Sequence, residues 1–214
     1  MVLDRFEFER KLWSRGVTRV AGVDEAGRGP LAGPVVAAAV MLPYAWATAG
    51  FDERLRDLND SKQLTAPQRE VFFVILTANP AIRYAVASVD AATIDRLNIL
   101  QATHRAMNEA LAQLQPQPGH VLVDGRPVKS MSLPNTALVK GDARSYSIAA
   151  ASVLAKVTRD RLMREFDGRY PGYGFAEHKG YGTPQHLAAL TERGPCPIHR
   201  RSFAPLKPRQ RELL

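Results

Sequence analysis

The sequence predicts an α/β protein in which a mixed sheet is flanked by helices and followed by a helical C-terminal appendage. Two patterns carry this prediction. Short apolar runs of strand length alternate with longer segments of helical periodicity, and a segment rich in glycine and proline, residues 168–183, follows the last long helix. We therefore expect one domain with its core at about 18–166, the appendage at about 167–205 and a tail at 206–214.

Five apolar runs have the length of strands. The first two, at about 20–25 and 34–42, are joined by a Gly-Arg-Gly-Pro turn, which predicts a hairpin with a wide connection. The other three lie at 82–89, 120–124 and 136–140. The order strand–strand–helix–strand–helix–strand–strand–helix fits a mixed sheet with helices packed on it.

Helical periodicity marks the segments between and after these runs. We predict helices over 5–15, 66–78, 93–115, 145–166 and 184–192. The third of these is expected to be interrupted near Asn98. Thr65 is a typical N-cap for the second helix, and Pro67 fits its first turn. Residues 43–64 are predicted to be mostly loop.

The composition favours a polyanionic partner and a reducing compartment. Lysine and arginine outnumber aspartate and glutamate by 29 to 21, which gives the 214-residue chain a formal charge of +8 and favours nucleic acid. The single cysteine, Cys196, excludes an internal disulfide. The N-terminus lacks the apolar core of a signal peptide, and no apolar run is long enough to span a membrane. We therefore expect a cytoplasmic protein without a membrane partner.

Acidic side chains follow three of the predicted strands. Asp24 and Glu25 end the first run, Asp124 ends the fourth, and Asp142 comes just after the fifth. Because ligands collect at the carboxyl ends of strands in open sheets, we expect these four carboxylates to lie together. Their mutual repulsion calls for a cation, and oxygen ligands suit Mg²⁺ or Mn²⁺. For Asp124 or Asp142 alone a turn residue is the simpler interpretation, but three acidic strand ends in one chain favour a metal site.

The neighbouring positions of Asp24 and Glu25 leave one question open. Successive side chains of a regular strand point to opposite faces, so both cannot face one metal ion from a regular strand. Either the strand is bulged or already finished at this point, or Glu25 reaches the ion from the side, through water or through its carbonyl.

The turn that follows these acids, Gly27–Gly29, allows the backbone to approach a phosphate or a sugar closely. Together with Ala32 and Asp52 it also matches a degraded dinucleotide-binding fingerprint. That fingerprint should open a helix, whereas residues 35–40 have the pattern of a strand. The preceding carboxylates would also repel a pyrophosphate, so we reject a dinucleotide site.

Eight short motifs occur in order along most of the chain. They are DEAGRGPLAGP (24–34), DSKQL (60–64), VDG (123–125), KGD (140–142), SIAAASVLAKVTRD (147–160), YGF (173–175), HKGYGT (178–183) and HRRSF (199–203). In this arrangement they resemble type 2 ribonuclease H, ribonuclease HII. The resemblance runs from about Val20 to Pro205 with sensible gaps, and chance does not explain agreement over so many separate motifs.

This resemblance implies an RNase H-like fold and an endonuclease that hydrolyses the RNA strand of RNA/DNA hybrids. It also implies incision at single ribonucleotides embedded in duplex DNA, which leaves 3′-hydroxyl and 5′-phosphate ends. The family's metal ligands fall on Asp24, Glu25, Asp124 and Asp142. Two cations, roughly 3.5–4 Å apart in such sites, would activate a water and stabilise the leaving 3′-oxygen.

The resemblance also assigns a reader of the RNA–DNA junction. The backbone of Gly27, Arg28 and Gly29 would approach the ribose 2′-hydroxyl, which is the group that distinguishes RNA from DNA. Tyr181 would stack on the neighbouring deoxyribose. Without the resemblance, a plain tight turn explains the glycines and a packing anchor explains the tyrosine.

Lysines and histidines of the same motifs have two interpretations each. Lys62, which follows Ser61 in the DSK motif, and Lys179 are candidate phosphate contacts. For Lys156 an ion pair with an acid is an equal alternative. The remaining two, His178 and His199, are better explained as hydrogen-bonded structural residues than as proton carriers.

Two functions compete with a monomeric type 2 enzyme. Type 3 ribonuclease H usually carries an extra N-terminal domain, whereas about nineteen residues precede the first strand here. A non-catalytic hybrid-binding protein would keep the basic surface but would gain nothing from carboxylates that face phosphates. Separately, the tail Gln210–Leu214 faintly resembles the peptide with which DNA-repair enzymes dock on sliding clamps, although a basic tail without a fixed partner is the simpler explanation.

Overall fold

Five strands form one mixed sheet in the computed structural model, which describes residues 4–47 and 50–207. They are β1 (Val20–Ala26), β2 (Val35–Met41), β3 (Arg83–Val89), β4 (His120–Asp124) and β5 (Asn135–Leu138). Their order across the sheet is β3-β2-β1-β4-β5. β1 and β2 form the predicted hairpin, β3 is antiparallel to β2, and β4 and β5 run parallel to β1. The prediction of a mixed sheet is therefore confirmed.

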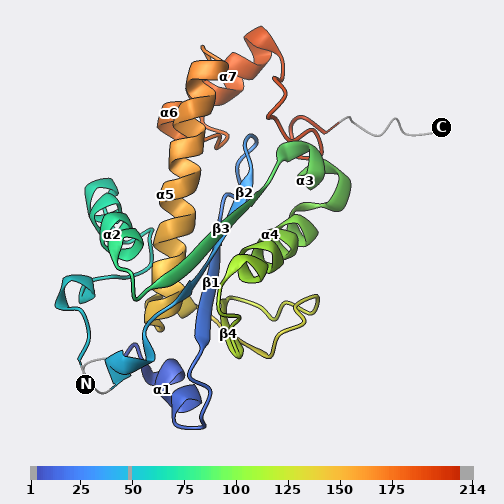
Figure 1. Cartoon of the computed structure of the whole chain (residues 1–214). Helices are drawn as coiled ribbons and strands as arrows, with labels where there is room; N and C mark the ends of the chain where they lie inside the picture. Colours follow the sequence, from blue (N-terminus) through green and yellow to red (C-terminus); the bar gives the residue numbers. More distant parts are fainter. Residues whose placement is uncertain (1–3, 48–49, 208–214) are drawn as a thin grey trace.

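Helices cover both faces of this sheet (Figure 1). The helices of residues 4–47 and 50–207 are α1 (Glu7–Trp13), α2 (Ala66–Ala78), α3 (Ala91–Leu97), α4 (Ile99–Gln113), α5 (Tyr146–Arg169), α6 (Phe175–His178) and α7 (Pro184–Arg193). α5 packs on β1 and β2 from one side with α2 beside it, and α4 packs on β2 and β3 from the other side. Side chains of β2 alternate accordingly, with Val36 and Val40 in the core under α5 and Ala37 and Ala39 in the core under α4.

The first turn of α5 lies directly against β1. A Cβ added at Gly22 would lie 2.2 Å from the carbonyl carbon of Ser147, so only glycine permits this approach. Ser145 caps the helix by accepting a hydrogen bond from the amide of Ile148 at 3.2 Å. The buried carboxyl of Glu9 in α1 accepts hydrogen bonds from the hydroxyls of Ser145 and Ser147, each at 2.6 Å. These contacts fix the face of α5 that runs past the acidic end of β1.

The appendage lies at the C-terminal end of α5 (Figure 1) and has a small core of its own. That core consists of Ala32, Met163, Tyr173, Phe175, Ala189 and Cys196. Ala32 belongs to the loop between β1 and β2. The appendage therefore packs against the same loop that carries the turn after the acidic strand end.

Helix starts follow the capping chemistry of the sequence. Thr65 forms a capping box with Gln68, as expected for the helix that begins at residue 66. Asn98, with a φ of 70°, ends α3 and caps α4, which confirms the predicted interruption. The helix α3 begins two residues earlier than predicted because the Asp90 carboxylate accepts a hydrogen bond from the amide of Thr93 at 2.7 Å.

Other boundaries differ from the prediction. β5 ends at Leu138 rather than at residue 140, because Lys140 adopts the left-handed region with a φ of 54°. α5 continues to Arg169, across the expected division at 166, and this division of the chain stays a prediction. Segments expected as loops contain α6 and three short 3₁₀ helices, namely η1 (Tyr44–Ala47), η2 (Glu53–Leu55) and η3 (Gly141–Ala143). Among the helices of the described ranges, none combines the length and the apolar character needed to cross a membrane.

Candidate active site

Three aspartates from neighbouring strand ends lie together and form what we call the aspartate cluster. One carboxylate oxygen from each of Asp24, Asp124 and Asp142 lies within 4.8 Å of the others. β1 and β4 pair in parallel up to the residues just before Asp24 and Asp124, so these two side chains leave the sheet at the same level. Asp142 lies in η3, and the amide of Gly141 donates a hydrogen bond to Oδ1 of Asp124 at 2.7 Å.

Burial and mutual repulsion raise the pKa values in this cluster. The pKa of Asp24 lies well above its ordinary value because of burial and then because of the charges on Glu25 and Asp124. The pKa of Asp142 is raised to about 6 by burial and then by Asp124 and Asp60. A divalent cation relieves such repulsion, and hard carboxylate oxygens are the ligands that Mg²⁺ and Mn²⁺ prefer. The donor set therefore fits an ion of this kind.

Glu25 lies beside the aspartate cluster but is not one of its three members. β1 continues its regular pairing with β2 through Ala26, so neither a bulge nor a strand end separates Asp24 from Glu25. Asp24 contacts Ser152 of α5, whereas Glu25 borders a pocket on the α4 side of the sheet. It pairs there with Arg28 at 3.2 Å. Of the alternatives open in the sequence, an approach to the cluster from the side is the one that this geometry permits.

A pocket of about 320 Å³ opens beside Glu25, and the expected substrate contacts form most of its wall. It is lined by Glu25, Ala26, Gly27, Arg28, Gly29, Ser61, Lys62, Ser152, Lys156, Arg159 and Tyr181. Gly29 and Tyr181 face each other, since a Cβ added at Gly29 would lie 3.6 Å from Cε1 of the tyrosine. Tyr181 is 48% exposed, so its ring is accessible to a ligand. We call Gly27–Gly29 the reading turn, after the role that the family resemblance predicts for it.

The DSK loop is held between α5 and the aspartate cluster. The hydroxyl of Ser152 donates to that of Ser61 at 2.9 Å, which fixes the loop on the helix. Burial disfavours the charge of Lys62, but Asp60 and the aspartate cluster outweigh it and raise the pKa of the ammonium. Asp60 was not expected at this site, yet it lies beside Asp142 and contributes to its raised pKa.

The other two lysines differ from each other. Lys156 lines the pocket and also pairs with Asp160 at 2.7 Å, so both interpretations of this residue apply. Lys179 is absent from the pocket wall. Its ammonium donates to the carbonyl of Ala176, and burial lowers its pKa. A phosphate contact by Lys179 stays a prediction.

Comparison with known proteins decides the family. The sequence profile of ribonuclease HII matches residues 21–206. The chain belongs to the ribonuclease HII family. It is 53% identical to a ribonuclease HII of Geobacter metallireducens over 206 residues, which cover 93% of each chain. It is 54% identical to a ribonuclease HII of Geobacillus thermodenitrificans, over 94% of this chain and 74% of that one. Family membership identifies an enzyme, a metal-dependent ribonuclease H of type 2.

Solved structures agree with this family. The chain resembles the ribonuclease H2 of Pyrococcus horikoshii at 32% identity, with a TM-score of 0.71 over 88% of this chain and 95% of that one. It resembles ribonuclease HII from a PCNA:RNase HII complex of Archaeoglobus fulgidus at 26% identity, with a TM-score of 0.70 over 91% and 98% of the two chains. A Bst-RNase HIII shares the fold alone, at 20% identity and a TM-score of 0.68 over 88% and 68% of the two chains. The RNase H-like fold is confirmed, and these comparisons favour neither the type 3 enzyme nor a non-catalytic binder.

Two buried arginines, neither of them predicted as a site residue, shape the reading turn and its surroundings. Arg159 of α5 donates to the carbonyls of Ala32 and Pro34 at 3.0 and 2.9 Å, and to that of Lys179 at 3.0 Å. It lies so close to the turn that a Cβ added at Gly27 would approach its Nε to 2.0 Å. Arg159 therefore ties the β1–β2 loop to the loop that carries Tyr181.

Arg200 also supports the reading turn. Its guanidinium donates to the carbonyls of Gly27, Arg28 and Gly33 at 2.5, 2.9 and 3.0 Å. Burial and the neighbouring Arg159 lower the pKa of Arg200 to about 9. Its position in the HRRSF motif was the available signal, but that motif does not show that the partners are backbone carbonyls.

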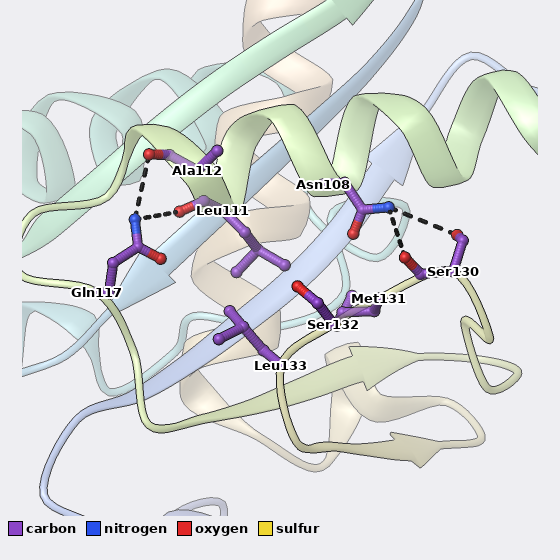
Figure 2. Close-up of a pocket in the computed structure, with 8 residues that line it drawn as sticks. All are labelled: Asn108, Leu111, Ala112, Gln117, Ser130, Met131, Ser132 and Leu133. Atoms are coloured by element: carbon purple, nitrogen blue, oxygen red, sulfur yellow. Dashed lines mark hydrogen bonds between the residues drawn. The ribbon is translucent and has the colours of Figure 1, made fainter.

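Of the pockets around α4, two differ in their relation to the active site. The larger, about 640 Å³, shares Glu25, Arg28 and Asp124 with the active site and continues it past Arg126 and Lys129. Figure 2 shows the smaller one, about 330 Å³, between α4 and residues 130–133. Hydrogen bonds from Asn108 and Gln117 close its ends, and none of its lining residues is acidic. The smaller pocket is therefore no part of the active site.

Proposed function

We propose that this chain incises duplex DNA 5′ to an embedded ribonucleotide and hydrolyses the RNA strand of RNA/DNA hybrids. The observation that carries the proposal is that the aspartate cluster adjoins the pocket between Gly29 and Tyr181, with Glu25 beside both. The formal charge of +8 favours such a polyanionic substrate. The products would carry 5′-phosphate and 3′-hydroxyl ends, and the role would be removal of misincorporated ribonucleotides and of primer RNA.

We propose that Asp24, Glu25, Asp124 and Asp142 hold two Mg²⁺ or Mn²⁺ ions. When bound, such ions lower the pKa of a water nucleophile and stabilise charge on the leaving oxygen. The chain contributes the placement of the ligands. The amide of Gly141 orients Asp124, and the raised pKa of Asp24 and Asp142 supports a site that binds cations in place of protons.

The remaining residues would recognise the substrate. The amides of Arg28 and Gly29 have no acceptor within residues 4–47 and 50–207, so they can donate to the 2′-hydroxyl of a ribonucleotide. The exposed ring of Tyr181 would pack on the adjacent deoxyribose. Lys62 and Lys156 would attract the phosphates, because both residues line the pocket.

A duplex with one ribonucleotide tests this function. The protein is incubated with Mg²⁺ or Mn²⁺ and a labelled DNA duplex that contains a single ribonucleotide, and an all-DNA duplex of the same sequence is the control. We expect one nick 5′ to the ribonucleotide, with the phosphate on the 5′ end, and an uncut control. If folded protein leaves the ribonucleotide duplex intact with both ions, the proposed function is wrong.

We further propose that the tail Gln210–Leu214 binds a sliding clamp, that the enzyme is a monomer and that it acts in the cytoplasm. The PCNA complex of the Archaeoglobus fulgidus ribonuclease HII supports clamp binding. The tail itself lies outside the described residues. Deletion of residues 210–214 should abolish capture by an immobilised clamp and leave nicking without the clamp unchanged. Undiminished capture would contradict this role.

A further inference from the structure

Residues 198–200 of the appendage pair with the loop that carries the reading turn. The amide of Gly33 donates to the carbonyl of Ile198 at 2.9 Å, and the amide of Arg200 donates to that of Leu31 at 2.8 Å. His199 and Arg200 are adjacent in this paired segment, and they are 2% and 0% exposed. Because neighbouring side chains of an extended segment point in opposite directions, the two residues act on different loops.

Arg200 sets the direction of the peptide groups in the reading turn. It binds the carbonyl oxygens of Gly27 and Arg28. In a trans peptide the C=O and N–H bonds point in opposite directions. The amides of Arg28 and Gly29 therefore point away from Arg200, on the side where these residues line the pocket.

Arg200 forms no salt bridge with a carboxylate in the described part of the chain. None of the ion pairs there includes it, and its donors are satisfied by three backbone carbonyls instead. A buried guanidinium is costly unless its donors are satisfied. The turn and the side chain therefore depend on each other, since displacement of the turn would leave the buried cation with the carbonyl of Gly33 as its one remaining acceptor of the three.

His199 is connected to the loop of Tyr181 by hydrogen bonds through a second histidine, His186. The amide of Cys196 donates to Nδ1 of His199 at 2.9 Å, so the proton of this neutral ring is on Nε2. That Nε2 lies 3.0 Å from Nε2 of His186, which must accept and therefore carries its proton on Nδ1. Nδ1 of His186 in turn donates to the carbonyl of Tyr181 at 2.9 Å. The two neutral rings thus form a directed chain that ends at Tyr181.

We propose that His199 and Arg200 are positioning residues that together set the geometry of the junction-reading pocket. Arg200 orients the reading turn, and His199 acts through His186 on the backbone of Tyr181. The inference rests on the proposed function of that pocket. Both sets of hydrogen bonds start from adjacent residues of one buried segment, so the spacing between Gly29 and Tyr181 depends on that segment.

Affinity for two duplexes that differ in one 2′-hydroxyl tests this role. In an Asp124→Asn background, which prevents cleavage, fluorescence anisotropy measures the Kd of an all-DNA duplex and of the same duplex with one ribonucleotide. Arg200→Lys keeps the charge but loses the fork that binds three carbonyls, and His199→Phe keeps a ring but removes both nitrogens. We expect each variant to lose about tenfold or more of the preference for the ribonucleotide. Arg201→Lys, at an exposed residue directly after this segment, is the matched control and should keep the preference.

The outcomes separate positioning from a merely structural role. An unchanged preference in both Arg200→Lys and His199→Phe overturns the inference, even if their unfolding temperatures fall. If Arg200→Lys does not fold, His199→Phe decides alone, because its ring can still pack beside Tyr173 and Phe175. Absence of any preference in the Asp124→Asn parent is a different result. It overturns the proposed function of the pocket and removes the premise of the inference.

Discussion

The two halves of the active site are built in opposite ways. In the aspartate cluster, like charges lie within 4.8 Å of one another, and burial and repulsion raise the pKa of Asp24 and Asp142. In the reading turn, the carbonyls of Gly27 and Arg28 are bound by a buried guanidinium in which each of the three nitrogens already has an acceptor. The first half needs a ligand to become electrostatically satisfied, whereas the backbone of the second half is already held in place by the protein.

This difference assigns a different physical task to each half. A group of mutually repelling carboxylates binds cations favourably, because the ion removes a repulsion that already exists. Recognition of a single hydroxyl has the opposite requirement. A pair of donors that is already held in place loses little conformational entropy when the substrate binds. The hydrogen bonds to the hydroxyl can therefore contribute almost fully to the difference in binding free energy between substrates with and without it.

We expect the largest effect from a substitution that disrupts the aspartate cluster alone. Asp124→Asn should lower the nicking rate by more than about 100-fold. The reason is that loss of a metal ligand should reduce activity more than loss of the residues that support such a ligand. The fold should survive, since an amide oxygen can still accept the hydrogen bond from Gly141. Initial rates on the ribonucleotide duplex and thermal unfolding in EDTA measure the two effects. Asp57→Asn, at an exposed carboxylate, is the control, and wild-type turnover in Asp124→Asn would show that the catalytic centre lies elsewhere.

Addition of metal should distinguish the two halves by stability. At a concentration 100 times its Kd, Mn²⁺ or Mg²⁺ should raise the free energy of unfolding by about 2.7 kcal/mol. For a chain of this size this corresponds to a rise in Tm of about 5–10 °C. Differential scanning fluorimetry with and without EDTA measures the shift, which should nearly vanish in Asp124→Asn. An equal shift in both proteins would place the stabilising ion outside the aspartate cluster.

The sequence predicted the first half better than the second. Each clustered aspartate follows an apolar run, and such runs predict both a strand and the edge at which it ends. Asp24 and Asp124 were therefore expected side by side, and parallel pairing of β1 and β4 brings them together. The position of Asp142 is less regular, because it depends on the left-handed backbone of Lys140 and on the turn of η3.

The supports of the reading turn could not be predicted in the same way. Arg159 and Arg200 bind backbone carbonyls of the β1–β2 loop that lie more than a hundred residues away along the chain. Every residue has a carbonyl, so the acceptors leave no pattern in the sequence. A side-chain pair such as Lys156 with Asp160 can be predicted from helical spacing. A guanidinium that binds backbone carbonyls of a distant loop can be identified only once the complete fold is known.

A pair of glycine substitutions sharpens the contrast within the second half. At Gly27, with a φ of +96°, an added Cβ would lie 2.0 Å from Nε of Arg159. Gly27→Ala should therefore lose about 1–3 kcal/mol of unfolding free energy as well as activity. At Gly29 the nearest atom to an added Cβ is Cε1 of Tyr181, at 3.6 Å, so Gly29→Ala should change stability by no more than about 0.5 kcal/mol and reduce nicking alone. Urea unfolding and initial rates test the pair, and equal stabilities would show that the turn is not rigidly supported.

Acidification should lower the free energy of unfolding through His199, which belongs to the second half of the site. This decrease per pH unit should be smallest near neutral pH. His199 is buried and neutral, and burial followed by the neighbouring His186 lowers its pKa to about 4, whereas its ordinary value is 6.5. Between these values the unfolded chain binds more protons than the folded one, so stability falls as the pH falls from 6.5 to 4. Above this window the contribution is fully present, and below it nothing further is lost.

The expected change is about 0.7 kcal/mol between pH 7 and pH 6, rising toward about 1.4 kcal/mol per pH unit lower in the window. Urea unfolding in EDTA at several pH values measures it. The titratable or charged groups around His199, which are His186, Tyr173, Cys196 and Arg201, remain in His199→Phe. This variant should therefore lose stability less steeply on acidification than the wild type, by the proton that His199 no longer takes up on unfolding. Parallel curves for the two proteins would mean that His199 is not held neutral by the fold, and the directed histidine chain to Tyr181 would lose its physical basis.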